Sequence, residues 1–224
     1  MSEWWTYAPR DLLMFSPDTY YRLFELHNTA LWPTQIFMLA AGLAIIALLL
    51  RPTPWAGRAI AVLLAMAWAF VAWAYFYERY ATINLAAPTY AWIFLAQSIL
   101  LLVYGAGLGR LCIERPQRAI QWIGVALFVF ALLLQPLIGP LTGHTWQGAE
   151  MFGIAPDPTV AASLGVLLAA ARTPWLLLPI PLLWCAINGA TLWTMGAPEA
   201  PLMPVLGGLV VVVGLYRSFI RAES

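Results

Sequence analysis

Long apolar runs separated by short polar connections make up the chain after residue 28. Seven runs can be distinguished, over residues 32–50, 59–77, 89–108, 119–138, 159–171, 175–195 and 202–216. A helix rises about 1.5 Å per residue, so roughly 20 apolar residues cross the ~30 Å hydrocarbon core of a bilayer. The pattern predicts an all-α polytopic membrane protein with seven transmembrane helices, in a single domain over residues 29–224. The fifth run is too short to cross unaided.

The first 28 residues are aromatic and mixed in charge, and they are too polar to span a bilayer. Ser16 followed by Pro17 is typical of a helix start, with Ser16 as the N-cap. Apolar side chains and His27 then recur at intervals of three to four residues. We expect residues 1–28 to form an N-terminal interfacial segment with helix within 11–28, its aromatic rings at headgroup depth.

Composition agrees with a membrane protein. Hydrophobic residues make up 62% of the chain and charged residues only 9%, which is too little charge to cover a water-soluble surface. The formal net charge of +1 provides no basic field for nucleic acid. The chain has no lysine, which excludes Schiff-base chemistry. The expected partners are the lipid bilayer and either a small solute or another protein, and no nucleic acid.

Arginine placement predicts the orientation. If the seven runs alternate across the membrane, one side carries eight of the eleven basic residues and the other side carries three. The larger set is Arg51, Arg58, Arg110, Arg115, Arg118, Arg172, Arg217 and Arg221, and the smaller set is Arg10, Arg22 and Arg79. Arginine is enriched in cytoplasmic connections, so we expect the N-terminus outside and the C-terminus in the cytoplasm.

Two segments resemble each other. An apolar run follows Pro33-Thr34 and ends at Arg51, and another follows Pro158-Thr159 and ends at Arg172. This similarity suggests a parallel repeat of three helices, one linker helix and three helices, with repeats 32–108 and 158–218 and a linker over 119–138. Small transporters contain repeats of this kind. The alternative is chance, because proline, threonine and arginine are all common at helix ends.

The candidate binding residues gather in residues 138–159. This stretch holds His144, Glu150 and Asp157 with four glycines and three prolines. If the short fifth helix, with Asp157 as its N-cap, begins below the membrane surface, residues 139–157 fold inward behind it. They would then line an outward cavity, which Glu25 and His27 approach from the N-terminal segment. The alternative is structural: Asp157 only caps a helix, Glu150 is solvated and His144 anchors the loop.

Other polar groups in the apolar runs are neutral. Asn188, one turn from Trp184, is the best candidate to line a cavity there, whereas most such groups are expected to form hydrogen bonds between helices. No catalytic motif is present, so an enzyme is the least favoured class. His144 and Glu150 would be the ligands if a metal were bound, but their spacing of six is not a helical metal spacing. No cofactor is identified.

Two strings carry a resemblance to a known family. FSPxxYxRLxExHN followed by WPxQ, and the later FGxxPDPT, resemble a family of bacterial multi-pass inner-membrane proteins of unknown function. The resemblance implies a bacterial inner-membrane protein and assigns no activity. From the helix pattern and the polar stretch 138–159 we expect a transporter or binding protein for a small solute with a site at the outer face. The alternatives are a non-catalytic subunit or assembly factor and, third, a membrane-embedded enzyme.

Overall fold

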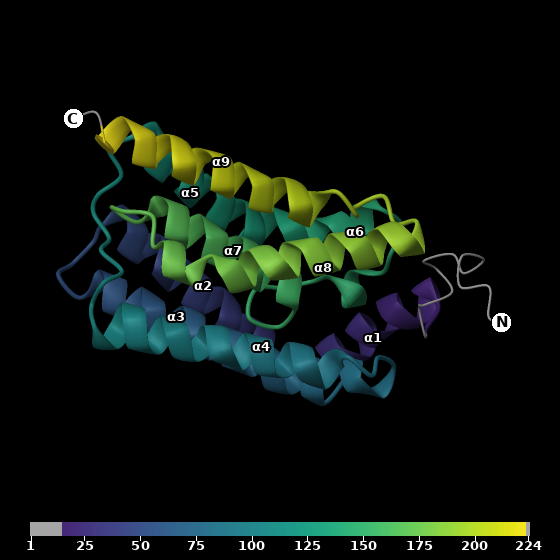
Figure 1. Ribbon diagram of the computed structural model, residues 1–224. Coiled ribbons are helices and arrows are strands. Elements are labelled where there is room, and N and C mark those ends of the chain that lie inside the picture. The colour runs from purple at the N-terminus through teal and green to yellow at the C-terminus, as the bar shows by residue number, and fades with distance from the viewer. Residues whose placement is uncertain (1–14, 223–224) are drawn as a thin grey trace.

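Every regular element in the described residues, 15–222, is helical in the computed structural model, and this range contains no β-strand (Figure 1). The α-helices are α1 (Pro17–Ala30), α2 (Thr34–Leu50), α3 (Ala56–Phe70), α4 (Ala87–Leu100), α5 (Ala119–Val129), α6 (Ile138–Leu141), α7 (Pro156–Ala169), α8 (Pro179–Met195) and α9 (Leu202–Ala222). Wider π-helical turns extend α3 to Tyr77, α4 to Gly107 and α5 to Leu134. The all-α prediction is confirmed.

Five helices in the described residues are long and apolar enough to cross a membrane. They are Ala56–Thr82, Ala87–Gly107, Ala119–Leu141, Trp175–Met195 and Leu202–Ile220. The predicted number of seven is therefore wrong. The 17 residues of α2 and the 14 of α7 rise only about 26 Å and about 21 Å. The pair α1 and α2 passes the same test only together, and it is bent by 91°.

Helix α7 lies at the centre of the bundle, and all 14 of its residues are buried. It packs against α3, α5, α8 and α9, which surround it. Its contact with α5 is backbone to backbone. A Cβ added at Gly165 would lie 2.7 Å from the Phe128 nitrogen, and one added at Gly124 would lie 2.4 Å from the Ala169 nitrogen. Two small residues therefore allow these helices to touch.

Neutral polar side chains join the helices, as the sequence predicts. The Trp68 indole N–H on α3 donates to the Ser163 hydroxyl on α7 at 2.7 Å. The Gln97 amide on α4 donates to the Leu177 carbonyl at 3.0 Å. Both bonds are buried, where an unpaired polar group costs about 1–3 kcal/mol. These bonds fix how α3 and α4 sit against the centre of the bundle.

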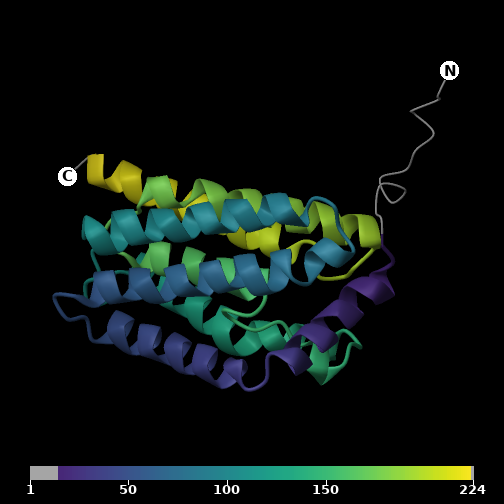
Figure 2. The same cartoon turned by 90° about the horizontal axis from the view of Figure 1, so that it is seen from below.

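Helix α1 runs at a steep angle to the bundle, at the end opposite the C-terminus (Figures 1 and 2). Its predicted start is confirmed, because the Ser16 hydroxyl accepts from the Thr19 N–H at 3.2 Å and Pro17 is the first helical residue. Tyr20, Phe24 and His27 are buried along one side of the helix. The predicted interfacial segment 1–28 includes residues 1–14, which lie outside the described residues.

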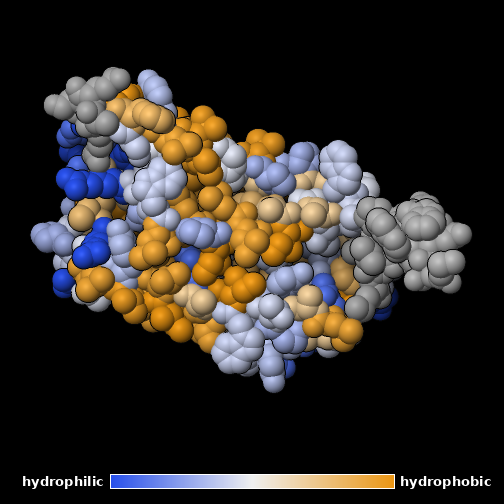
Figure 3. All heavy atoms as spheres, viewed as in Figure 1, coloured by the Kyte–Doolittle hydropathy of each residue, from blue (hydrophilic) through white to orange (hydrophobic). Residues whose placement is uncertain are grey.

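The surface is apolar around the middle of the bundle. Figure 3 shows hydrophobic atoms over this region, and the most hydrophilic atoms of this face at the end where the chain finishes. Large side chains such as Phe37 (70% exposed) and Trp92 (71% exposed) point outward. A water-soluble monomer rarely exposes so large an apolar surface, so the surface is compatible with a lipid environment.

Helices α2 and α7, which begin the two predicted repeats, are buried to very different extents. Four residues of α2 are buried, whereas every residue of α7 is. The difference follows from position, because α2 lies at the edge of the bundle (Figure 2). The internal repeat stays a prediction, and superposing residues 32–108 on 158–218 would measure it.

Candidate functional site: an acidic cavity at one end of the bundle

The loop between α6 and α7 folds into the bundle and places the N-terminus of α7 inside it. Thr159 anchors this loop, because its hydroxyl accepts from the Gly153 N–H at 2.8 Å and donates to the Ala155 carbonyl at 2.7 Å. Gly153 has a φ of +73°, which a residue with a Cβ rarely adopts. Residues 152–157 are buried, so the end of the loop folds inward as predicted, whereas most of residues 141–147 are exposed.

The helix start differs from the prediction by two residues. Helix α7 begins at Pro156 with Ala155 as the N-cap, and no side chain caps it. The prediction of Asp157 as the N-cap was therefore wrong, because Asp157 lies in the first turn of α7. Prolines at 156 and 158 remove two of the N–H groups that a capping side chain would otherwise satisfy. The Asp157 carboxyl is left free to face the cavity instead.

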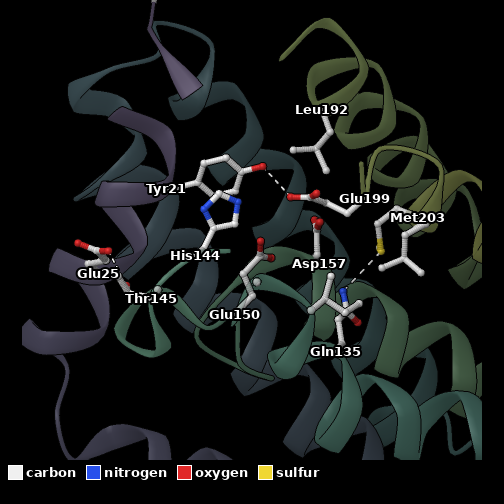
Figure 4. Close-up of a pocket in the computed structure, with 14 residues that line it drawn as sticks. Tyr21, Glu25, Gln135, His144, Thr145, Glu150, Asp157, Leu192, Glu199 and Met203 are labelled. Carbon is white, nitrogen blue, oxygen red and sulfur yellow. Dashed lines mark hydrogen bonds between the residues drawn. The ribbon is translucent and has the colours of Figure 1, made fainter. Parts of the chain in front are cut away.

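A small cavity lies between α1, the end of α5 with α6, the folded-in loop, α7, α8 and the start of α9 (Figure 4). Its volume of about 40 Å³ has room for roughly one to three water molecules. Drug-sized ligands occupy sites of about 300–1,000 Å³. In this conformation the cavity therefore fits a small ion or the polar end of a larger solute. The titratable residues that line it are Tyr21, Glu25, His144, Glu150, Asp157 and Glu199.

Asp157 lies at the inner wall of the cavity and is only 5% exposed. The Trp184 indole N–H donates to its Oδ1 at 2.7 Å. Burial raises the pKa of Asp157 to about 7, although hydrogen bonds from Trp184 and Asn188 oppose the rise. Burial therefore outweighs the favourable hydrogen bonds, and near neutral pH this carboxyl is divided between its two protonation states.

Glu150 approaches the cavity from the folded-in loop. Burial raises its pKa well above the usual range, and the nearby charges of Asp157 and Glu199 raise it further. Its Oε2 is buried and has no hydrogen-bond partner among the described residues. Two interacting carboxyls lose their protons in steps that belong to the pair. Glu150 and Asp157 therefore retain at least part of a proton at neutral pH.

Tyr21 and His144 cover the cavity on the side of α1. The Tyr21 hydroxyl donates to Glu199 Oε1 at 2.6 Å and so joins α1 to the α8–α9 connection. The His144 ring stacks on the Tyr21 ring with a centroid distance of 3.6 Å. Beside them, the Thr145 hydroxyl donates to Glu25 Oε1. The cover is thus made of aromatic rings and two hydrogen bonds from separate elements.

The cavity wall is rich in acceptor oxygens. Three of its buried oxygens have no partner among the described residues: Glu150 Oε2, Glu199 Oε2 and Gln135 Oε1. Gln135 itself is only 5% exposed. None of the 14 described residues that line the cavity is an arginine. Buried acceptors without donors cost free energy, so this wall favours a ligand that brings hydrogen-bond donors or positive charge.

The structure brings four of the predicted site residues to the cavity. Glu25, His144, Glu150 and Asp157 line it, while Trp184 and Asn188 act one step away through their contacts with Asp157. His27 does not reach the cavity. Its Nε2–H donates to the Ile154 carbonyl at 3.2 Å, and the buried ring anchors the loop. His27 thus anchors the loop, which is the structural role that was considered for His144 from the sequence.

Two lining residues were missed by the sequence analysis. Tyr21 lies one helical turn before Glu25, so both face the same side of α1. Glu199 lies in the connection between the runs 175–195 and 202–216, which the predicted orientation places outside. Helical spacing could have identified Tyr21. The approach of Glu199 depends on how the α8–α9 connection packs, and no local signal in the sequence indicates it.

The geometry does not form a metal centre. Nowhere in residues 15–222 do three or more His, Cys, Asp or Glu side chains lie close enough together to hold a metal ion. His144 and Glu150 line the same cavity as Glu25, Asp157 and Glu199, but these side chains do not form such a cluster.

Comparison with known proteins gives a family without an activity. The profile of a family of unknown function, DUF6064, matches residues 17–223, so the chain belongs to that family. No curated protein and no solved structure matches the chain. The resemblance to a family of unknown function is confirmed, and the family assigns no substrate or site.

Proposed function

We propose that this chain is a bacterial inner-membrane protein that binds a small cationic solute in the acidic cavity, with the cavity facing the outside. Five apolar helices of membrane-spanning length support the location. The cavity lies beside the start of α9, at Leu202 and Met203, and the C-terminus lies at the other end of that 21-residue helix. Arginines favour the cytoplasmic side, and more of them flank the C-terminal end, which supports an outward-facing cavity.

The convergence of Glu150, Asp157 and Glu199 around one space without an arginine carries this proposal. Carboxyl groups that serve only structure are usually paired with a basic side chain or fully hydrogen-bonded when they are buried. Here two of the three have a buried oxygen without a donor. A cation would satisfy these oxygens and offset the repulsion between the carboxyls.

The absence of a metal-ligand cluster among the described residues favours an ammonium group over a directly coordinated metal ion. Direct metal coordination needs several ligand atoms about 2.0–2.6 Å from one point, and no such cluster occurs among the described residues. An ammonium group instead donates N–H bonds over about 2.7–3.0 Å to separate acceptors. The Tyr21 and His144 rings at the cover add aromatic surface, which attracts cations.

The cavity is closed toward the other side of the membrane in this conformation. Helix α7 begins at its inner wall, and every residue of α7 is buried against its neighbours. A solute that enters from outside therefore reaches a dead end unless α7 shifts. Passage of the solute across the membrane would require a second arrangement of α7.

Calorimetric titration of the purified full-length protein in detergent with methylammonium chloride tests the proposal. We expect saturable binding of methylammonium and much weaker binding of tetramethylammonium, which carries the same charge without an N–H donor. Sodium chloride at matched ionic strength controls for screening. Equal heats from all three salts, or no saturable heat from methylammonium, would remove the proposal.

A further inference from the structure

We propose that the cavity exchanges its cation for a proton, so that one ammonium group enters as one carboxyl proton leaves to the outer solution. This inference rests on the proposed function, because it concerns the same cavity and the same ligand class. It goes beyond binding because it assigns an activity, cation–proton exchange, to the three carboxyl groups.

Two carboxyl oxygens in the cavity wall lack a donor. Glu150 Oε2 and Glu199 Oε2 are buried there, and neither receives a hydrogen bond from the described residues. Gln135, nine-tenths buried, presents a further acceptor without a partner. An ionised buried carboxylate without a donor is costly, whereas a protonated carboxyl supplies the missing donor itself. A proton held among the carboxyls therefore takes the place that a cation would take.

The groups around the carboxyls provide little positive charge. The titratable groups near Asp157 and Glu150 are Tyr20, Tyr21, Glu25, Tyr75, Tyr80, His144, Cys185 and Glu199, and the cavity residues of α6 and α9 are not titratable. His144 is the single basic side chain of this described set. The carboxyls therefore depend on a proton or on a bound cation for charge compensation, and the raised pKa of Asp157 and of Glu150 agrees with this.

The exchange balances in atoms and charge. The ammonium group keeps its three N–H bonds and donates them to carboxylate oxygens. The O–H bond of one carboxyl breaks, its electron pair stays on the oxygen, and the proton passes to water. The net charge of the cavity is the same before and after, so exchange avoids the cost of placing an uncompensated charge in a buried site.

The exchange predicts how affinity depends on pH. Below the pKa of about 7 for Asp157, each cation must displace a proton, so the dissociation constant should fall by up to about tenfold for each unit of rising pH. The dependence should flatten once the carboxyls are ionised. A site whose carboxyls are already ionised would instead bind with nearly constant affinity over the same range.

The test counts protons. Methylammonium binding to the full-length protein is measured calorimetrically at about pH 6 in two buffers of different ionisation enthalpy, and the difference in heat gives the protons released per cation. We expect close to one proton per cation at this pH and fewer as the pH rises. The Glu78→Gln variant, which changes an exposed acid away from the cavity, should release the same number as the native protein.

The outcomes separate the two proposals. Saturable binding without proton release at about pH 6 overturns the exchange and leaves the binding site intact. No saturable binding at any pH overturns the proposed function, and the exchange falls with it. Asp157→Asn should lower the proton count while the protein still binds. If that variant does not fold, the count for the native protein alone decides.

Discussion

Replacing Asp157 by asparagine should make the protein more stable at neutral and alkaline pH. In the folded protein the pKa of Asp157 is about 7, against an ordinary value of 3.8. One pKa unit corresponds to about 1.4 kcal/mol, so ionising this carboxyl in the folded state costs about 4 kcal/mol relative to the unfolded chain. Asparagine stays neutral, and its side-chain oxygen can still accept the bond from Trp184.

The sign of the pH dependence follows from the direction of this pKa shift. Because the folded pKa lies above the unfolded one, the folded protein binds more protons between about pH 4 and pH 7. The stabilisation is fully present below the unfolded pKa and is lost as the pH rises through the folded pKa. From about pH 5 to about pH 8 the free energy of unfolding of the native protein should fall by about 3 kcal/mol. For a chain of this length, that loss lowers the melting temperature by roughly 6–12 °C.

Thermal unfolding of the purified protein in one detergent, over this pH range, measures the effect. The native protein should melt at lower temperature as the pH rises, and Asp157→Asn should make this slope smaller without removing it. Glu150 contributes in the same direction, because its pKa is also raised by burial. The Glu78→Gln control should keep the native slope. An unchanged slope in Asp157→Asn would show that this carboxyl is not buried in the way described.

Other parts of the structure give further predictions. Gly165→Ala should destabilise the protein by about 1–3 kcal/mol in denaturant unfolding, because its Cβ would lie 2.7 Å from the α5 backbone. Gly208→Ala on α9 has no atom within 4 Å of its new Cβ, so this variant should be more stable by about 0.5–1 kcal/mol. A lower stability would contradict the described packing. Tyr21→Phe removes the donor to a half-buried carboxyl and should cost about 1 kcal/mol, and no loss would mean that the bond is not formed in solution. Reporter fusions after Arg115 and at the C-terminus should report cytoplasm and fusions at Glu78 the outside, and the reverse pattern would place the cavity on the cytoplasmic side.

Local chemistry explains the parts of the fold that the sequence predicted well. Ser16 and Pro17 mark the start of α1 through short-range capping, which depends only on neighbouring residues. The burial of residues 152–157 agrees with the expectation, drawn from the short fifth run, that the chain before α7 folds inward. The convergence of His144, Glu150 and Asp157 followed from that fold.

The parts that were missed depend on tertiary packing. The residues of α7 are mostly apolar around the whole helix, so its sequence has no distinct polar side. The pattern therefore does not indicate that α7 is the central helix. The length of the run 32–50 exceeds the 17 helical residues of α2, because the chain turns at residues 31–33 before the helix begins. The bond between Tyr21 and Glu199 joins residues 178 positions apart, and no periodic pattern connects them.

Measuring how much cation the cavity binds tests the proposed site most directly. Equilibrium dialysis with radiolabelled methylammonium compares the full-length protein with the double variant Glu150→Gln/Asp157→Asn, and with Glu78→Gln as a matched control. Thermal unfolding first establishes that each variant is folded. We predict saturable binding to the native protein and to the control, and loss of binding in the double variant. Undiminished binding by a folded double variant would contradict the assignment of the acidic cavity as the site.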